Sequence, residues 1–179
     1  MLEKRLFLQG NKTERIRQAL CKAGWYPGRK VTVSPVLDYY NKWNIALSPQ
    51  AIAFFQEYYG IASRWYIEVN HLEWGADFEF QLFPYPKEWK TDIVDFMYDD
   101  ADYVLESEEY RNLKDYANEH VVMVGEIGYY YPARVWIGNS KTIYCTHEYE
   151  DDIRKFDSVI SLILYELSGH DFDSVAMKA

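Results

Sequence analysis

The chain has few cysteines, no long apolar run and little positive charge, and each shortage excludes a class of protein. Its 179 residues include only Cys21 and Cys145, which excludes a disulfide framework and favours two reduced, buried thiols. No run of 18 apolar residues occurs, which excludes a transmembrane helix. The N-terminal residues also lack the apolar stretch of a secretory signal. We therefore expect a cytoplasmic protein that does not enter a membrane.

The net charge is negative because acidic residues are concentrated in one segment. The net charge is −9, and residues 91–119 contain ten acidic but only two basic side chains, whereas the first ninety residues have a net charge of +3. Binding to a nucleic-acid backbone needs clustered lysine and arginine. We therefore expect no direct binding of nucleic acid, and a basic protein partner fits the charge better.

The common motifs of enzymes and metal sites are missing as well. The sequence contains no GxGxxG, P-loop, GxSxG or HExxH motif. No two of the four histidines have metal-ligand spacing, and the polar stretch 147–150 is a weak candidate for a metal. We expect no catalytic residues, no cofactor and no metal. A small hydrolase that uses paired carboxylates remains an alternative, since sequence cannot reveal a cleft.

What the chain does have is enough apolar material for one domain over residues 1–179, because hydrophobic residues make up 49% of it. Thr13 predicts the cap of a helix that ends at Gly24, and a short strand follows at 29–33. Two Ser-Pro pairs predict the starts of helices at 36–43 and 50–59. Alternation predicts strands at 64–69 and 77–83.

The second half predicts more strands than helices. A helical stretch at 91–120 is interrupted near Ser107, and a strand at 121–124 leads into a turn at 125–128. A hairpin at 133–137 and 142–145 precedes a last helix at 153–168, and the tail beyond His170 has no pattern. This order predicts an α+β domain with one mixed or mainly antiparallel sheet packed by helices.

The acidic segment contains a row of carboxylates on one helix face. Steps of four, three and four residues separate them, so they form one stripe, opposite an apolar one. No lysine follows any of them at i+4, although like charges at that spacing repel by roughly 0.2–0.5 kcal/mol per pair. A solvated helix face is one interpretation, and a site for a cationic partner is the other. The residues are Asp95, Asp99, Asp102 and Glu106.

A second candidate surface is aromatic. Tyr129, Tyr130 and Tyr131 follow a glycine-rich stretch, and three consecutive tyrosines cannot all face one core. Tyrosine is favoured in interfaces because it combines a large contact area with a hydroxyl group. The alternative is a loop that packs on the sheet.

The segment AGWYPGR at residues 23–29 is the most distinctive local pattern. It resembles the GW-x-PxR turn of the SUKH superfamily of bacterial immunity proteins, in particular its third subgroup, with the Smi/Knr-like fold. The order of the following elements is also similar over about residues 13–170, including VVMVGEIG at 121–128. The family-motif residues are Trp25, Pro27, Gly28, Arg29, Gly125, Glu126 and Gly128.

This resemblance implies an immunity protein that binds and neutralises a cognate toxin of a contact-dependent or polymorphic toxin system. Many such toxins are nucleases, and the resemblance implies stoichiometric occlusion rather than catalysis. The motif residues would then form the scaffold, while the acidic row and the three tyrosines would contact the toxin. A regulatory or scaffold module without a toxin partner is the alternative, since eukaryotic relatives of the superfamily resemble signalling adaptors.

Overall fold

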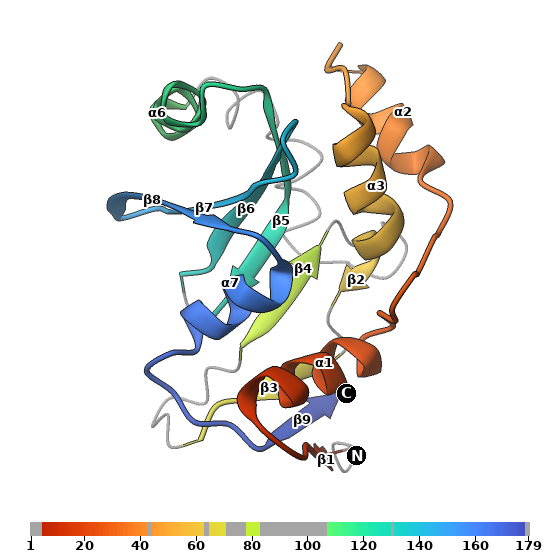
Figure 1. The fold of residues 1–179 in the computed structure, drawn as a ribbon, viewed down its shortest axis with the longest axis vertical. Helices are drawn as coiled ribbons and strands as arrows, with labels where there is room; N and C mark the ends of the chain where they lie inside the picture. Colours follow the sequence, from red (N-terminus) through yellow and green to blue (C-terminus); the bar gives the residue numbers. More distant parts are fainter. Residues whose placement is uncertain are drawn as a thin grey trace.

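The computed structural model describes residues 5–42, 44–62, 65–70, 78–82, 107–129 and 131–177. They form an α+β structure in which helices pack around two antiparallel sheets (Figure 1). The helices in these ranges are α1 (Lys12–Lys22), α2 (Ser34–Lys42), α3 (Pro49–Tyr58), α6 (Glu108–Ala117) and α7 (Val159–Glu166). The strands are β1 (Arg5–Phe7), β2 (Ile61–Ala62), β3 (Trp65–Glu68), β4 (Glu79–Leu82), β5 (Val121–Gly128), β6 (Ala133–Gly138), β7 (Ile143–His147), β8 (Glu150–Phe156) and β9 (Ser174–Met177).

The larger sheet has six strands in the order β2-β4-β5-β6-β7-β8, with every pair antiparallel. Side chains alternate between its two faces. Val135 and Cys145 point into the large core that also contains residues of α1, α3 and α7. Trp136 and Tyr144, on the opposite face, pack with Leu113 of α6 in a smaller core. The sheet therefore separates α6 from the other helices (Figure 1).

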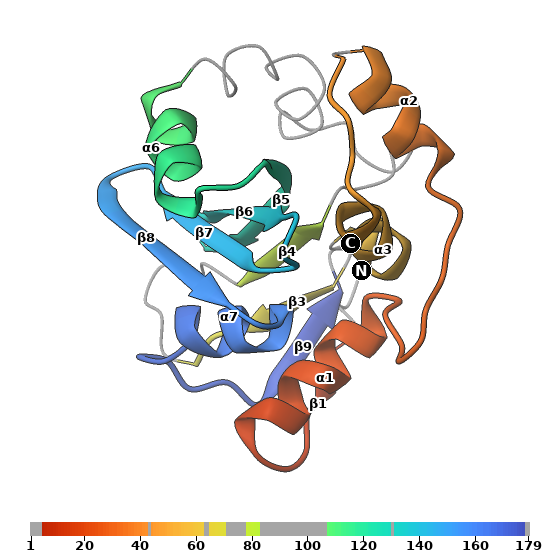
Figure 2. The same cartoon turned by 45° about the horizontal axis from the view of Figure 1, so that its top comes forward.

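The smaller sheet has the order β1-β9-β3, so the last strand of the chain lies between two strands from the first half. In the described part of the chain, one bridge between Ile67 and Phe78 connects this sheet to the larger one. Helices α1 and α7 pack against each other beside it (Figure 2). The N- and C-terminal parts of the described chain thus stabilise one another.

Several sequence predictions are confirmed. Helix α3 begins after Ser48, whose side chain accepts a hydrogen bond from the Ala51 backbone, and Pro49 occupies the first turn. Helix α6 begins in the same way after Ser107. The predicted hairpin is formed by β6 and β7. None of the helices in the described residues is long and apolar enough to cross a membrane.

Four local predictions in the first half and at the C-terminus are wrong. The cap of α1 is Asn11, in a capping box with Glu14, rather than Thr13. Residues 29–33 form no strand; the Val31 backbone amide instead donates to a carbonyl at the end of α3. Cys21 is exposed rather than buried. The tail beyond His170 contains β9, whose short length and mixed residues gave no periodic signal.

Two predictions in the second half are also wrong. Residues 125–128 are not a turn, because β5 continues through them, with an irregularity in its pairing between Met123 and Gly125. The predicted helix at 153–168 begins only at Val159, because residues 150–156 pair with β7 as strand β8. The apolar spacing in 153–168 was compatible with a helix, and cross-strand pairing decided against it. The strands also form two antiparallel sheets, whereas the sequence predicted one.

The AGWYPGR segment follows α1 and forms hydrogen bonds with the C-terminal end of α3. A turn closes from the Tyr26 carbonyl to the Arg29 amide, with Gly28 at a φ of 75°. The Trp25 indole donates to the Glu57 carboxylate over 3.0 Å. Arg29 is only 7% exposed and donates to the backbone carbonyls of Glu57 and Tyr59 over 2.7 and 2.8 Å. It therefore satisfies carbonyls at the C-terminal end of α3 that have no partner within the helix.

Candidate partner-binding surface

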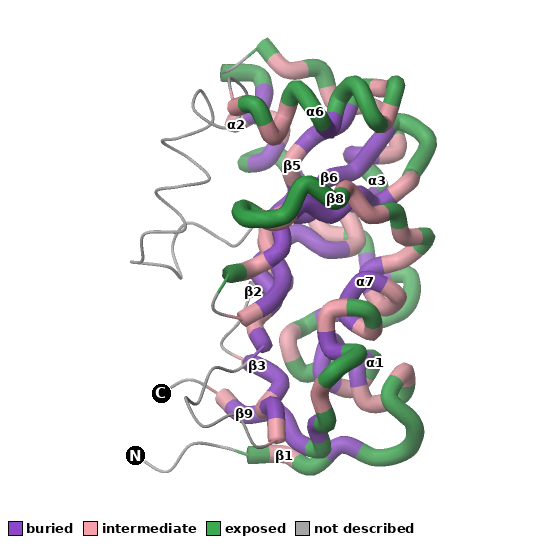
Figure 3. The backbone as a smooth tube through the Cα atoms, turned by 90° about the vertical axis from the view of Figure 1, so that its left-hand side faces the viewer, coloured by how far each residue is buried: buried purple, intermediate pink, exposed green. Residues whose placement is uncertain are grey.

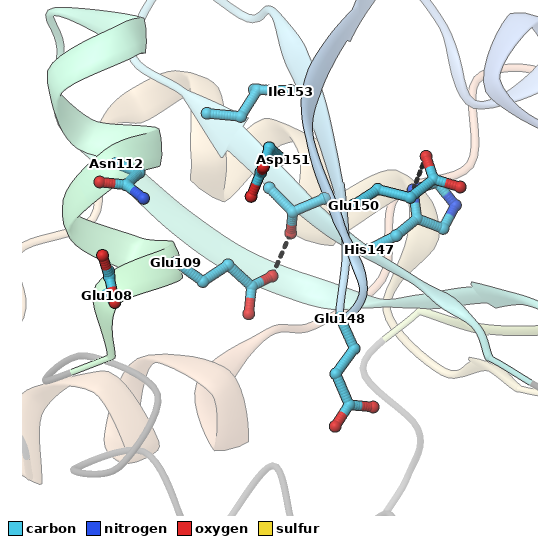
Figure 4. Close-up of a pocket in the computed structure, with 9 residues that line it drawn as sticks. Glu108, Glu109, Asn112, His147, Glu148, Glu150, Asp151 and Ile153 are labelled. Carbon is cyan, nitrogen blue, oxygen red and sulfur yellow. Dashed lines mark hydrogen bonds and ion pairs between the residues drawn. The ribbon is translucent and has the colours of Figure 1, made fainter.

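A pocket of about 280 Å³ lies between α6 and the hairpin of β7 and β8 (Figure 4). Among the described lining residues there are five carboxylates, together with polar residues, and no lysine or arginine. Helix α6 itself is mostly exposed, while the strands beneath it are mostly buried (Figure 3). The lining residues are Glu108, Glu109, Asn112, Thr146, His147, Glu148, Glu150, Asp151 and Ile153.

The position of α6 determines one wall of this acidic pocket. Leu113 is fully buried against the sheet, and the Tyr110 ring stacks on Trp136 with centroids 5.6 Å apart. Because Ser107 caps the helix, Glu108 and Glu109 fall in the first turn. Negative side chains are stabilised there by the helix dipole. The helix can therefore present two adjacent carboxylates to the pocket without losing stability.

Glu109 is held in place by a chain of hydrogen bonds from the sheet. The Trp136 indole donates to the Thr146 hydroxyl over 2.9 Å, and that hydroxyl donates to Glu109. Arg134 also donates to Glu109 in a close ion pair. This side chain is fixed by charge-assisted hydrogen bonds on both sides.

Glu126 lies on β5 directly across from Arg134 of β6. Its carboxylate is 3.9 Å from the Arg134 guanidinium, and its side chain is only 12% exposed. The pKa of Glu126 is raised to about 7, chiefly by burial and also by the charges of Glu109 and Glu148, while Arg134 opposes the increase. The Arg134 guanidinium thus interacts with two carboxylates, those of Glu109 and Glu126. Of these, Glu126 is partly protonated near neutral pH.

The outer part of the pocket offers less compensated charge. Glu150 is paired with Arg154 over 2.7 Å, and this hydrogen bond lowers the pKa of Glu150. Glu108, Glu148 and Asp151 are exposed and form no ion pair with another residue that the structure describes. These three carboxylates, named here the acidic rim, are available to an external cation.

Two exposed tyrosine rings contact each other, and one of them, Tyr149, follows Glu148 of the acidic rim in the chain. Tyr149, between Glu148 and Glu150, is 72% exposed and packs edge to face against Tyr131, with centroids 5.1 Å apart. Tyr131 is 52% exposed. Exposed aromatic area beside charge is typical of protein interfaces.

Residues 12–154 match the family model of the SUKH-3 immunity proteins. The chain belongs to this family. Comparisons with curated proteins and with solved structures give no match. Membership indicates a role in immunity to a toxin and a cognate toxin as the partner. Helix α7 and strand β9 of this SUKH-3 protein lie beyond the matched residues.

The residues that the sequence predicted to contact the toxin fall into three groups: some lie outside the described residues, one is half-buried and one is exposed. The acidic row Asp95, Asp99, Asp102 and Glu106 and the central Tyr130 lie outside the described residues. Tyr129 is half-buried, packs against the large core, and forms a hydrogen bond with His170. Tyr131 is the described member of the tyrosine run that is exposed.

The acidic rim of the SUKH-3 protein was not predicted as a unit. The sequence predicted a helix after Ser107, which contains Glu108, and gave residues 147–150 only as a polar stretch that is a weak candidate for a metal. These segments are about forty residues apart in the sequence, and only the packing of α6 on the sheet brings them together. The concentration of acidic residues after a serine cap was the one available signal.

The family-motif residues are positioned as scaffold. Gly125 has a φ of 147°, and a Cβ atom there would be 2.1 Å from the Gln81 carbonyl oxygen of the neighbouring strand. Trp25 is 8% exposed and stacks on Tyr58. Glu126 differs, because its carboxylate belongs to the charge network under the acidic pocket.

Proposed function

We propose that this SUKH-3 protein neutralises a toxin of a contact-dependent or polymorphic toxin system by stoichiometric binding in the cytoplasm, without catalysis. The bound protein occludes the active site of the toxin or another essential surface. The toxin presents a basic face, as nucleases do because they bind polyanions. The acidic pocket, whose described lining has five carboxylates and no lysine or arginine, is the observation that supports this proposal.

The surface has two parts with different tasks. The acidic rim attracts the basic face over a distance and increases the association rate, which electrostatic steering can raise to about 10⁸–10⁹ M⁻¹s⁻¹. Tyr131 and Tyr149 supply aromatic contact area, which slows dissociation once they are buried. Glu109 is already oriented by Thr146 and Arg134, so it loses little side-chain freedom on binding.

The test is charge reversal of the acidic rim in a binding measurement with the cognate toxin. The candidate toxin is the product of the neighbouring gene that co-purifies with this protein. The variant Glu108→Lys, Glu148→Lys, Asp151→Lys should bind at least about tenfold more weakly, mainly through slower association. The matched control, Asp38→Lys with Asp115→Lys, changes exposed acids outside the pocket and should retain affinity.

A second arm addresses the acidic row. Charge reversal at Asp95, Asp99 and Asp102 should also weaken binding if that row extends the same surface. An unchanged affinity in the rim variant, with a large loss in the row variant, would move the contact surface to residues 91–106. Unchanged affinity in both variants would reject the acidic docking surface, and a protein with no cognate toxin would favour the regulatory module.

A further inference from the structure

Behind the acidic pocket, three side chains with metal-binding atoms converge from different elements. Cys145 and His147 are two residues apart on β7, on either side of an irregularity in its pairing with β8, and Glu166 is the last residue of α7. One donor atom from each residue lies within 4.8 Å of the others. Cys145 is buried, and the side chains of His147 and Glu166 are each only 13% exposed. This Cys145–His147–Glu166 cluster was not apparent in the sequence, where Glu166 follows twenty residues later.

The donor atoms lie near one another but are spaced more widely than in a tetrahedral zinc site. The Cys145 sulfur lies 3.8 Å from Glu166 Oε1 and 4.0 Å from His147 Nδ1, and His147 Nε2 lies 3.1 Å from Glu166 Oε2. Zinc–sulfur bonds of roughly 2.3 Å and zinc–nitrogen or zinc–oxygen bonds of roughly 2.0 Å place donors roughly 3.3–3.5 Å apart. For one donor atom from each residue the separations are at most 4.8 Å, so the donors must approach one another by up to about 1.5 Å to share one ion.

The charges around the cluster also favour a cation. Arg154 is the basic residue that approaches it, and its guanidinium lies 3.2 Å from His147 Nδ1. The same guanidinium pairs with Glu150 over 2.7 Å and with Asp152 over 3.6 Å. Glu166 adds a further carboxylate to the cluster, beside His147. An incoming ion would replace Arg154 as the partner of the lone pair at His147 Nδ1. Arg154 would keep its pairing with Glu150.

We propose that Cys145, His147 and Glu166 form a binding site for a divalent transition-metal ion of the zinc type. Sulfur, imidazole and carboxylate together suit Zn²⁺ better than Mg²⁺ or Ca²⁺, which prefer oxygen ligands alone. On binding, the metal–sulfur bond forms as the Cys145 thiol proton leaves to solvent, and a water molecule completes four-coordination. The ion would join β7 to α7 behind the acidic pocket, independently of whether a toxin is bound.

Cobalt(II) titration of the full-length protein, followed by absorption spectroscopy, tests the site directly. One equivalent of Co²⁺ should produce intense visible bands of tetrahedral geometry and a thiolate-to-cobalt charge-transfer band in the near ultraviolet. Added Zn²⁺ should abolish both. The absence of a charge-transfer band at one equivalent would overturn the proposal and leave the cluster as a hydrogen-bond network.

The two cysteines provide a matched control. Cys21→Ser, at an exposed position of α1, should retain the charge-transfer band, whereas Cys145→Ser should lose it. Glu166→Gln keeps both thiols and should weaken zinc binding, measured by calorimetry, by at least about tenfold. Arg154→Gln should strengthen it, because the competing cation is gone. A band that survives in Cys145→Ser but disappears in Cys21→Ser would show that Cys21 binds the metal, and this would overturn the proposal.

Discussion

At the scale of single residues, Gly125 lies very close to the backbone of the neighbouring strand. The Gln81 carbonyl occupies the space that a side chain on residue 125 would need, and the backbone φ of 147° is one that L residues rarely adopt. A glycine at this position therefore allows β5 to pass close to β4 and continue to Glu126.

Gly125→Ala should lower the free energy of unfolding by at least about 3 kcal/mol, because backbone strain and overlap with Gln81 add. Gly169→Ala is the matched control, since a Cβ atom there has no neighbour within 4 Å. Urea denaturation monitored by tryptophan fluorescence measures both. Equal stability of the two variants would contradict the close-packing explanation.

Glu126 predicts a pH dependence of stability. Its pKa is about 7 in the folded chain, above the value of 4.5 that is normal for the group. The folded state therefore binds more protons between these values, and the free energy of unfolding falls as pH rises from 4.5 to 7, by about 3 kcal/mol. Above pH 7 this contribution is constant.

Glu126→Gln resembles the protonated side chain and should remove this slope. The variant should gain stability relative to the wild type as pH rises from 5 to 8, in urea denaturation at several pH values. Two curves that stay parallel over this range would show that Glu126 ionises as an ordinary carboxyl group.

At the scale of elements, the sequence predicted those whose signals are local. Helix α3 has a Ser-Pro start, α6 has a serine cap, and the hairpin of β6 and β7 has alternating strands around a polar turn. Strand β8 was missed because charged residues dominate it, although it pairs with the preceding strand β7. Strand β9 was missed because it is short and is stabilised by pairing with β1 and β3, which are distant in the sequence. Tertiary context overrides intrinsic preference in such segments.

The pairing of β9 with β1 and β3 leads to a prediction about stability. Val175 is fully buried between β1 and β3, so Val175→Asn should cost about 3 kcal/mol through lost packing and an unpaired amide. Asp173→Asn, two residues earlier and exposed, should change stability by less than about 0.5 kcal/mol. Thermal denaturation distinguishes the two. A tolerated Val175→Asn would mean that β9 is dispensable for the fold.

At the scale of the whole molecule, charge is distributed unevenly between the two faces of the larger sheet. The face covered by α6 contains the acidic pocket and the Glu109–Arg134–Glu126 network, whereas the opposite face is apolar. A long-range field from the exposed carboxylates would act on a basic partner before contact.

The proposed function therefore predicts a strong effect of salt. Raising the salt concentration from 0.05 to 0.5 M (approximately a tenfold change in ionic strength) should slow toxin association by about tenfold or more, with little change in dissociation. Surface plasmon resonance separates the two rates. The rim charge-reversal variant should show a weaker salt dependence, and identical salt dependence in both proteins would exclude the acidic rim as the source of steering.

The sequence by itself determined the α+β class, the capped helices and the family-motif turn, because capping, alternation and turn chemistry act between residues close in the chain. The tertiary structure decided what lies together: Glu108 with Glu148 across the acidic pocket, Glu126 under Arg134, and Cys145 beside Glu166. These groupings depend on the packing of α6 and α7 against opposite faces of one sheet. Packing between distant segments leaves no periodic trace in the residues that it joins.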